Sequence, residues 1–261
     1  MVGVLGQSVA APSAYTPAIL ERIERVSQRE QSGLGWDVWH CYELSWCVNG
    51  AVESWVGVLG IPADSPATVE SKSLKLYLNS LNHHEFESAQ HAISVITEDV
   101  SLCVGATVVL NLLPVTDLSA ITTELTGVNI PACPLGVEVG IINAEHLSIS
   151  PRKGNVVSEQ LITHNLRSLC PVTSQPDWGS LLIEYTGQQL DHESVARYLS
   201  GYRAHQGFHE QCLEQIFSDL MALPVSKLTV AAFYQRRGGI DITPWRSSEP
   251  LSMSLQRLGR Q

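Results

Sequence analysis

Three short segments of the sequence combine ionisable and nucleophilic side chains at spacings that could support chemistry. The first, residues 70–77, reads ESKSLKLY and follows a turn that contains Pro66. Backbone N–H groups at a helix start attract anions, and Lys72 and Lys75, three positions apart, place two ammonium groups on one side of that helix. The segment therefore predicts an anion site, although an ordinary capped helix start on the surface would use the same residues.

The second segment, residues 169–178, holds a cysteine and an aspartate in a loop stiffened by two prolines. Its sequence is LCPVTSQPDW, so the carboxyl group of Asp177 follows the thiol of Cys170 by seven positions. A thiolate is a nucleophile, and a nearby carboxyl group can supply a proton to the atom it attacks. The alternative is that Cys170 is only a small buried apolar residue.

The third segment, residues 205–210, reads HQGFHE at the start of a helical pattern. His205 and His209 have the i, i+4 spacing of metal ligands, but the order is the reverse of the zinc-protease motif, and we expect no metal here. Arg236 and Arg237, followed by two glycines, could clamp a phosphate or could simply end a charged strand. Residues 33–35 lack the third glycine of a dinucleotide fingerprint.

Composition narrows the class of protein. With 44% hydrophobic residues the chain can bury a core, and its formal charge of −10 argues against a protein that coats nucleic acid or an anionic membrane. An anionic ligand must therefore find local positive charge. The sequence contains neither an export signal nor a long apolar span, and its six cysteines form no CxxC pair, so we expect a cytoplasmic protein with reduced thiols.

The order of elements predicts an α+β fold built from two similar modules. A helix is expected from Thr16 to near Gly33, and a hairpin turns at Asn49-Gly50 between strands that alternate apolar and polar residues. Two helices and two strands follow, and the second half repeats nearly the same order. The predicted strands span 36–48, 51–60, 105–114, 136–150, 156–168, 180–188 and 225–236, and the predicted helices span 71–81, 85–100, 191–203 and 208–223.

Taken together, these segments resemble the long form of the NADPH-dependent 7-cyano-7-deazaguanine reductases, the nitrile reductases of queuosine biosynthesis. Residues 70–77 match the family's signature helix, and the loop from Cys170 to Asp177 and the triplet 208–210 stand where the long form has them. The resemblance implies two tandem tunnelling-fold modules of ββααββ order, residues 1–150 and 151–261. It also implies antiparallel sheets with paired helices on one face, which assemble edge to edge into a barrel. Because a two-module chain must pair its exposed sheet edges, we expect a homodimer or a larger closed assembly.

The resemblance also implies a chemistry for these residues. Cys170 would add to the nitrile and give a covalent thioimide, Asp177 would donate a proton, and two NADPH molecules would complete a four-electron reduction to the aminomethyl product. His209 would transfer protons and shield an imine. The residues implied to contact substrate are Val69, Glu70, Ser71, His209 and Glu210, those implied to contact the cofactor are Ser71, Lys72, Arg237 and Gly238, and no metal is implied.

Two other classes of function remain open from the sequence. A tunnelling-fold hydrolase or synthase that acts on GTP or a pterin would share the architecture and the carboxylate that anchors the base, but would use a zinc site. A binding or scaffold module could have kept the fold without catalysis. Stoichiometric zinc would favour the first alternative, and nitrile-dependent oxidation of NADPH would exclude the second.

Overall fold

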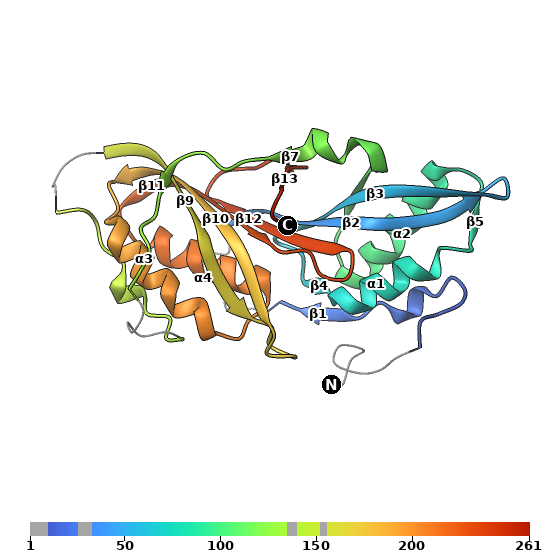
Figure 1. The fold of residues 1–261 in the computed structure, drawn as a ribbon, viewed down its shortest axis with the longest axis horizontal. Helices are drawn as coiled ribbons and strands as arrows, with labels where there is room; N and C mark the ends of the chain where they lie inside the picture. Colours follow the sequence, from blue (N-terminus) through green and yellow to red (C-terminus); the bar gives the residue numbers. More distant parts are fainter. Residues whose placement is uncertain (1–9, 26–32, 135–139, 152–155) are drawn as a thin grey trace.

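The structure, a computed structural model, describes residues 10–25, 33–134, 140–151 and 156–261. Helices and short 3₁₀ turns pack on one large sheet, so the expected α+β class is confirmed (Figure 1). In chain order the elements are η1 Pro17–Ile19, β1 Arg22–Glu24, β2 Leu34–Val48, β3 Ala51–Pro62, β4 Ala67–Val69, α1 Ser71–Ser80, β5 Glu85–Phe86, α2 Ala89–Val104, β6 Val109–Pro114, η2 Val115–Ile121, β7 Thr122–Thr123, β8 Val128–Asn129, η3 Ala144–His146, β9 Val156–Leu169, β10 Pro176–Gln188, α3 His192–Ser200, η4 Gly201–Ala204, α4 His209–Met221, β11 Val225–Tyr234, β12 Ile240–Ser247 and β13 Arg257–Leu258.

The large sheet runs in the order β6-β3-β2-β12-β11-β10-β9-β8, with β5 beside the end of β2. Its long neighbouring strands are antiparallel, and only the short strands β5 and β8 pair in parallel. Among the described residues the sheet stays open, with β6 and β8 at its edges, and no closed barrel forms within the chain.

The predicted hairpin forms at Asn49-Gly50, where both residues adopt positive φ angles of 52° and 74°. This conformation suits the turn that joins twisted strands. The expected single apolar face of β2 is wrong, however, because the register shifts between Cys41 and Leu44. A bulge reverses the alternation, so Trp39 and Leu44 pack beneath the helices although one position is odd and the other even.

Strand β12 joins the two halves of the sheet and was not predicted. The strand was not predicted because Asp241, Pro244 and Arg246 interrupt the alternation of apolar and polar residues that indicates a strand. In the structure β12 pairs with β2 from Ile240↔Cys41 to Ser247↔Leu34 and with β11 on its other side. A continuous sheet therefore connects residues that lie about two hundred positions apart in the chain.

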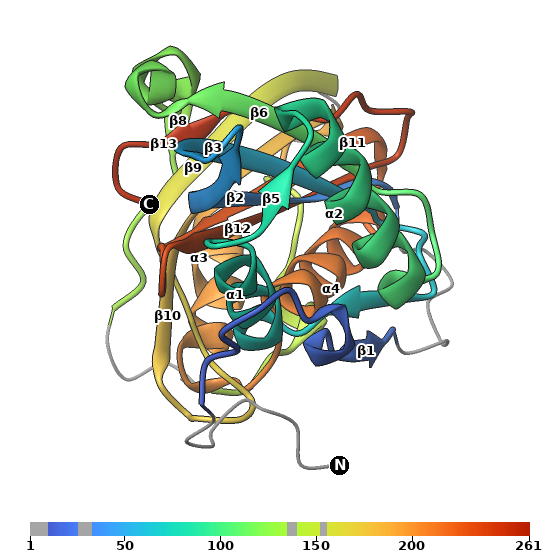
Figure 2. The same ribbon diagram turned by 90° about the vertical axis from the view of Figure 1, so that its right-hand side faces the viewer.

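The four α-helices of the described residues cover the same face of the sheet (Figure 2). Helices α1 and α2 pack on β2, β3, β6 and β12, and helices α3 and α4 pack on β9, β10 and β11. Each pair buries its own apolar cluster, as amphipathic helices on a sheet do. The starts of α1 and α4 face the seam between β2 and β12, where the candidate site residues lie.

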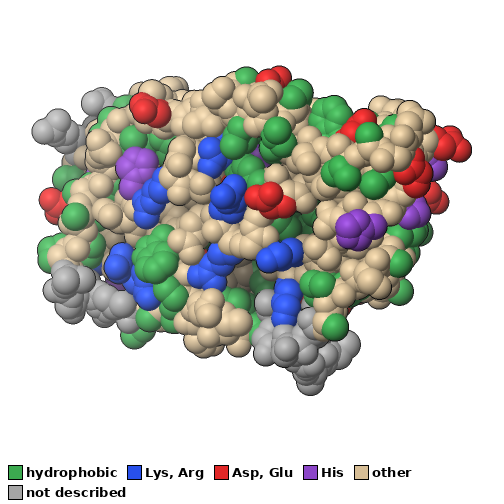
Figure 3. All heavy atoms as spheres, turned by 45° about the vertical axis from the view of Figure 1, so that its right-hand side comes forward, with side chains coloured by type: hydrophobic (Ala, Val, Ile, Leu, Met, Phe, Trp, Pro, Cys, Tyr) green, Lys and Arg blue, Asp and Glu red, His purple; other side chains and the backbone are tan. Residues whose placement is uncertain are grey.

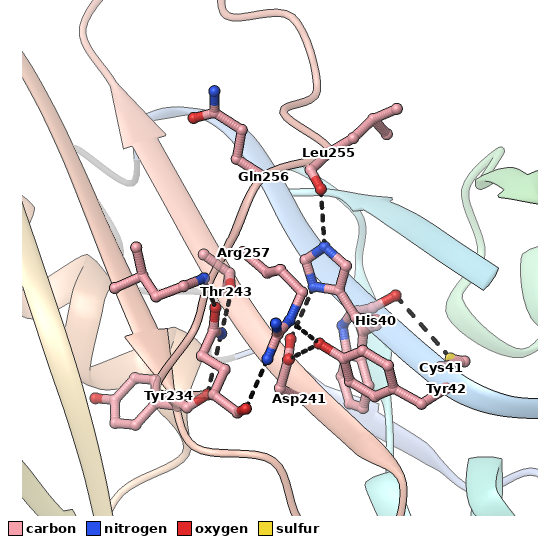
Figure 4. A network of polar contacts seen from close by, with 12 residues as sticks. His40, Cys41, Tyr42, Tyr234, Asp241, Thr243, Leu255, Gln256 and Arg257 are labelled. Carbon is pink, nitrogen blue, oxygen red and sulfur yellow. Dashed lines mark hydrogen bonds and ion pairs between the residues drawn. The ribbon is translucent and has the colours of Figure 1, made fainter. Parts of the chain in front are cut away.

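The opposite face of the sheet is covered by η2 and the C-terminal segment, residues 248–258. The fully buried His40 holds this segment on the sheet, because its Nε2 lies 3.0 Å from the carbonyl oxygen of Leu255 (Figure 4). Its Nδ1 lies 2.8 Å from Oδ1 of Asp241 on β12. Arg257 donates to the hydroxyl of Tyr42 at 2.6 Å, and Tyr42 in turn donates to Asp241.

Two predicted elements are wrong. The expected N-terminal helix is only the single 3₁₀ turn η1, after which β1 pairs with β4, so backbone pairing overrides the helical spacing of Ile19, Leu20 and Ile23; residues 26–32 lie outside the described residues. The expected strand 136–150 is not formed in its described part, residues 140–150, which contain a turn and η3.

Other boundaries shift by a few residues. Helix α2 begins at Ala89, because Ser88 caps it and Glu85 belongs to β5, and it ends at Val104, before Gly105, whose φ of 76° suits a helix C-cap. No helix among the described residues has the length and apolarity needed to cross a membrane.

Candidate active site

The predicted site residues meet at one cavity of about 390 Å³ at the seam of the sheet. This volume falls in the usual range for small-molecule pockets. The cavity lies between the starts of α1 and α4, the loop before β10 and the turn before β12. The predicted residues that line it are Val69, Glu70, Ser71, Lys72, Lys75, Cys170, Asp177, His209, Glu210, Arg237 and Gly238.

Hydrogen bonds attach the cysteine loop to the start of α4. The Cys170 N–H group donates to the carbonyl oxygen of Gln175 at 2.9 Å, and Ser174 N–H donates back to Cys170 at the same distance. Just before the cysteine, Leu169 donates to the carbonyl of His205 at 2.8 Å and accepts from Gly207 at 3.1 Å. These contacts place the half-buried Cys170 beside the helix that carries His209 and Glu210.

Asp177 connects the loop with a histidine and an arginine. Its side chain is almost fully buried; Oδ2 lies 3.3 Å from His209 Nε2, and Oδ1 lies 3.0 Å from an Arg237 guanidinium nitrogen. Arg237 also donates to Gln175 Oε1 at 3.2 Å and to the carbonyl of Pro176. Arg237, which the resemblance assigns to the cofactor, therefore also holds the carboxylate and its loop in place.

Glu70 caps helix α1 with its own side chain. Its Oε1 accepts from Lys72 N–H at 2.8 Å and its Oε2 accepts from Ser73 N–H at 2.7 Å, while the side chain stays 4% exposed. The sequence predicted that these N–H groups would attract an anionic ligand. The anion at this helix start is the protein's own carboxylate, so a bound anion would have to use the lysine side chains.

Glu210 has a different environment from Glu70. Burial and the negative charge of Asp37 raise the pKa of the Glu210 carboxyl group, with His209 and Arg25 opposing that shift. A buried cluster lies beside it, in which Arg246 contacts Asp37 and Glu214 at 2.7 Å each. The sequence analysis did not single out this cluster, because Asp37 and Arg246 are about two hundred positions apart in the chain.

The two histidines of the third segment have separate contacts. The ring of His205 packs edge-on against Tyr202, with centroids 5.8 Å apart, and burial lowers the pKa of its imidazole. His209 instead contacts Asp177. In the described part of the chain no group of three or more histidine, cysteine, aspartate or glutamate side chains could hold a metal ion. The absence of a metal from the reaction stays a prediction.

Lysine and arginine side chains gather around the middle of the face shown in Figure 3. Lys72, Lys75 and Arg237 line the cavity, and Lys75 also lines an adjoining groove of about 530 Å³ that contains Arg236. The Arg236 guanidinium carbon lies 4.7 Å from the centroid of the Tyr42 ring. A chain of net charge −10 thus offers local positive potential at the mouth of this cavity.

Comparison with known families adds a second kind of observation. Residues 11–112 match the N-terminal family model described as nitrile reductase, 7-cyano-7-deazaguanine-reductase, and residues 176–252 match a model described as QueF-like protein. The chain belongs to the nitrile reductase family. It is an oxidoreductase that acts on a carbon–nitrogen bond, with 7-cyano-7-deazaguanine as its small-molecule substrate in queuosine biosynthesis. The two family matches favour this activity over the two alternatives that the sequence left open, a hydrolase or synthase acting on GTP or a pterin and a scaffold without activity.

The two matched segments of this nitrile reductase meet at the cavity. The first contains Glu70 and Lys72, and the second contains Asp177, His209 and Arg237. Cys170 lies between the matches, six positions before the second one begins. Residues that the sequence analysis missed also line the cavity, and their apolar or neutral side chains gave no chemical signal: Trp39, Thr68, Gln175, Gln235, Ile240 and Ile242.

Replacement of Glu70 by alanine is expected to lower both stability and activity. Loss of the cap should lower the free energy of unfolding by about 1 kcal/mol, and Ser71 and Lys72 should lose their fixed place at the cavity. The control is Ser88→Ala, since Ser88 caps α2 through His91 N–H at 3.1 Å and does not line the cavity. Chemical denaturation measures the stability of the two variants, and nitrile turnover measures their activity. Equal activity in both variants would contradict a role for Glu70 in the site.

Proposed function

We propose that the chain reduces the nitrile of 7-cyano-7-deazaguanine by four electrons to the 7-aminomethyl product, with NADPH as reductant and Cys170 as a covalent nucleophile. The observation that carries this proposal is that Cys170, Asp177 and His209 line one cavity together with two buried glutamates, Glu70 and Glu210. The reaction needs a nucleophile, a proton donor and carboxylates that accept the N–H groups of the base.

The first step is addition of the Cys170 thiol across the nitrile. A bond forms between sulfur and carbon, one of the carbon–nitrogen π bonds is lost, and the nitrogen gains one proton, which gives a thioimide. As a carboxylate, Asp177 takes the proton that the thiol loses and delivers it to the nitrogen, and His209, whose Nε2 lies 3.3 Å from the carboxylate, is placed to supply the protons of the later steps. The half-buried position of Cys170 on the cavity wall supports this role.

The thioimide must then receive one hydride and the imine formed from it a second, and each is the hydride that one molecule of a reduced nicotinamide dinucleotide supplies when bound. The site suits this polyanion, because Ser71, Lys72, Arg237 and Gly238 lie together on the cavity wall. Gly238 adopts a φ of 59°, and a Cβ there would approach Lys75 Nζ to 3.0 Å, so glycine lets the ammonium group lie close to the backbone.

The release of sulfur and the supply of protons complete the four-electron reduction. After the first reduction the carbon–sulfur bond breaks, Cys170 recovers its thiol, and the imine that remains is reduced to the amine. The two hydrides end on carbon, and two protons that pass through Asp177 and His209 end on nitrogen. His209, whose side chain is 15% exposed, also shields the imine from water.

Nitrile affinity is expected to rise with pH, because Glu210 binds the base as a carboxylate. Burial raises the pKa of Glu210, so below that raised pKa the group is protonated and lacks one acceptor site, and above it the group is ionised. Titration calorimetry of Cys170→Ala protein between about pH 5 and about pH 8 should show affinity increasing and then levelling.

Adding Glu210→Gln to this background should weaken binding by about 10- to 100-fold and remove the rise with pH. The control is Glu145→Gln, an exposed position outside the cavity, which should change neither result. An unchanged pH profile in the Glu210→Gln protein would contradict this role for Glu210.

Two measurements test the proposed reaction. Loss of nicotinamide absorbance should depend on the nitrile, and NADH should support it less well than NADPH. Mass spectrometry of protein mixed with the nitrile alone should find one nitrile mass on the peptide that contains Cys170, which clears when NADPH is added. Turnover without such an adduct would refute the covalent route, and the absence of nitrile-dependent oxidation of NADPH would refute the choice of reductant.

The proposal includes two tandem tunnelling-fold modules, residues 1–150 and 151–261. The order β2-β3-α1-α2-β6 in the first half resembles β9-β10-α3-α4-β11-β12 in the second, and the helix pairs share one face. The open edges at β6 and β8 could pair in a homodimer that closes a barrel. A cytoplasmic location agrees with six unpaired cysteines.

A further inference from the structure

The imidazole of His209 lies flat on the ring of Tyr234. The ring centroids are 3.8 Å apart and the planes are inclined by 8°. Tyr234 is the last residue of β11 and is fully buried in the core beneath α3 and α4. Gly179 faces it on β10, where a Cβ would come within 3.3 Å of Tyr234 Cδ1, so the glycine leaves the space that the tyrosine ring occupies.

The backbone of Tyr234 is also fixed. Its carbonyl oxygen accepts a hydrogen bond of 3.0 Å from Gln261 Nε2, and the same amide group lies 2.9 Å from Thr243 Oγ1. Figure 4 shows Tyr234 at the edge of this polar network with its ring pointing away from it. A strand pairing, a side-chain amide and core packing thus hold the ring on which His209 rests.

Few other contacts orient the His209 ring. Nε2 faces Asp177 at 3.3 Å, whereas Nδ1 is buried without a hydrogen-bond partner among the described residues. The single contact between Nε2 and Asp177 does not fix the plane of the imidazole, which could still rotate about the line that joins the two atoms. The parallel stack on Tyr234 removes this freedom, because aromatic rings at this distance restrict each other's orientation.

We propose that Tyr234 is a positioning residue of the reduction, which fixes the plane of the His209 imidazole so that Nε2 stays directed at Asp177. This inference rests on the proposed function, in which protons pass through His209 and Asp177 to the substrate nitrogen. Proton transfer requires hydrogen-bond geometry, and a misplacement of about 1 Å can cost about 100-fold in rate.

The test compares Tyr234→Leu, which removes the ring, with Tyr234→Phe, which retains it. In Tyr234→Leu, kcat is expected to fall about 10- to 100-fold, while the KM for the nitrile stays within about 3-fold because Glu70 and Glu210 still bind the base. Tyr234→Phe should restore kcat to within about 3-fold of the original protein. If Tyr234→Leu does not fold, Tyr234→Met, which fills the space with a flexible side chain, takes its place.

A matched control separates positioning from general loss of core packing. Tyr198 is 1% exposed in the same core, packs on Tyr202 and does not line the cavity, so Tyr198→Leu should lower thermal stability but leave kcat unchanged below the melting temperature. An unaltered kcat in Tyr234→Leu, an equal loss in Tyr198→Leu, or an equal loss in Tyr234→Phe would each overturn the inference. Failure of the original protein to oxidise NADPH with the nitrile would instead refute the proposed function.

Discussion

Replacement of Cys170 by alanine is expected to abolish turnover while the cavity still binds the nitrile. Without the sulfur no thioimide can form, and loss of a covalent nucleophile typically lowers kcat by about 10⁴-fold or more. Noncovalent binding should persist, because Glu70 and Glu210 are unchanged and Cys170 supplies only one part of the cavity wall. Steady-state kinetics measures the first effect and titration calorimetry the second.

The control for this variant is Cys103→Ala. Cys103 is a free, partly buried thiol at the end of α2 and does not line the cavity, and burial raises the pKa of its thiol. This variant should retain full activity and the adduct mass on Cys170. Substantial turnover by Cys170→Ala, or loss of the adduct in Cys103→Ala, would exclude Cys170 as the nucleophile.

Replacement of Arg246 by methionine is expected to cause the largest loss of stability. Arg246 is fully buried and lies 2.7 Å from both Asp37 and Glu214, and Arg25 approaches the same Asp37 at 2.5 Å. Two guanidinium groups thus balance two carboxylates beneath α4. Breaking a buried ion pair on one side leaves an uncompensated charge, so the free energy of unfolding should fall by about 3–5 kcal/mol and the melting temperature by roughly 10 °C.

The expected pH dependence follows from Asp37. Burial alone would raise its pKa, but the charges of Arg246 and Arg25 outweigh burial and lower it below the usual 3.8. A lowered pKa in the folded state contributes stability above pH 3.8, and this contribution is lost as the pH falls through the lower folded value. The stability difference between the original protein and Arg246→Met should therefore shrink in strong acid.

Lys227→Met is the matched control for Arg246→Met. Lys227 and Glu249 form an ion pair of 2.8 Å, but both side chains are more than half exposed. Solvent screens such a pair, and its loss should change the free energy of unfolding by less than about 1 kcal/mol. Denaturant unfolding measures the free energy of unfolding of both variants. Equal losses of that free energy would show that burial of the Arg246 cluster does not add to stability.

Local sequence patterns predicted those elements whose signals lie within a few residues. The Asn49-Gly50 turn and its two strands, the helix at residues 71–80 and the paired helices of the second half all formed close to the expected positions. Turn chemistry, helical periodicity and capping are local properties, so a single sequence contains them. The residue types of Cys170, Asp177 and His209 likewise indicated nucleophile and proton-transfer chemistry, and together with the matching octet they indicated the family.

Tertiary structure decided the features whose partners are distant in the chain. The side of the sheet that each residue of β2 faces depends on a bulge at Cys41, and β12 is a strand because β2 pairs with it across about two hundred residues. Whether Asp37 and Arg246 are surface charges or buried partners follows from that pairing. The sequence by itself thus determined which chemical groups are present and most local elements, whereas only the folded sheet brought those groups to one cavity, because long-range pairing leaves no local periodic signal.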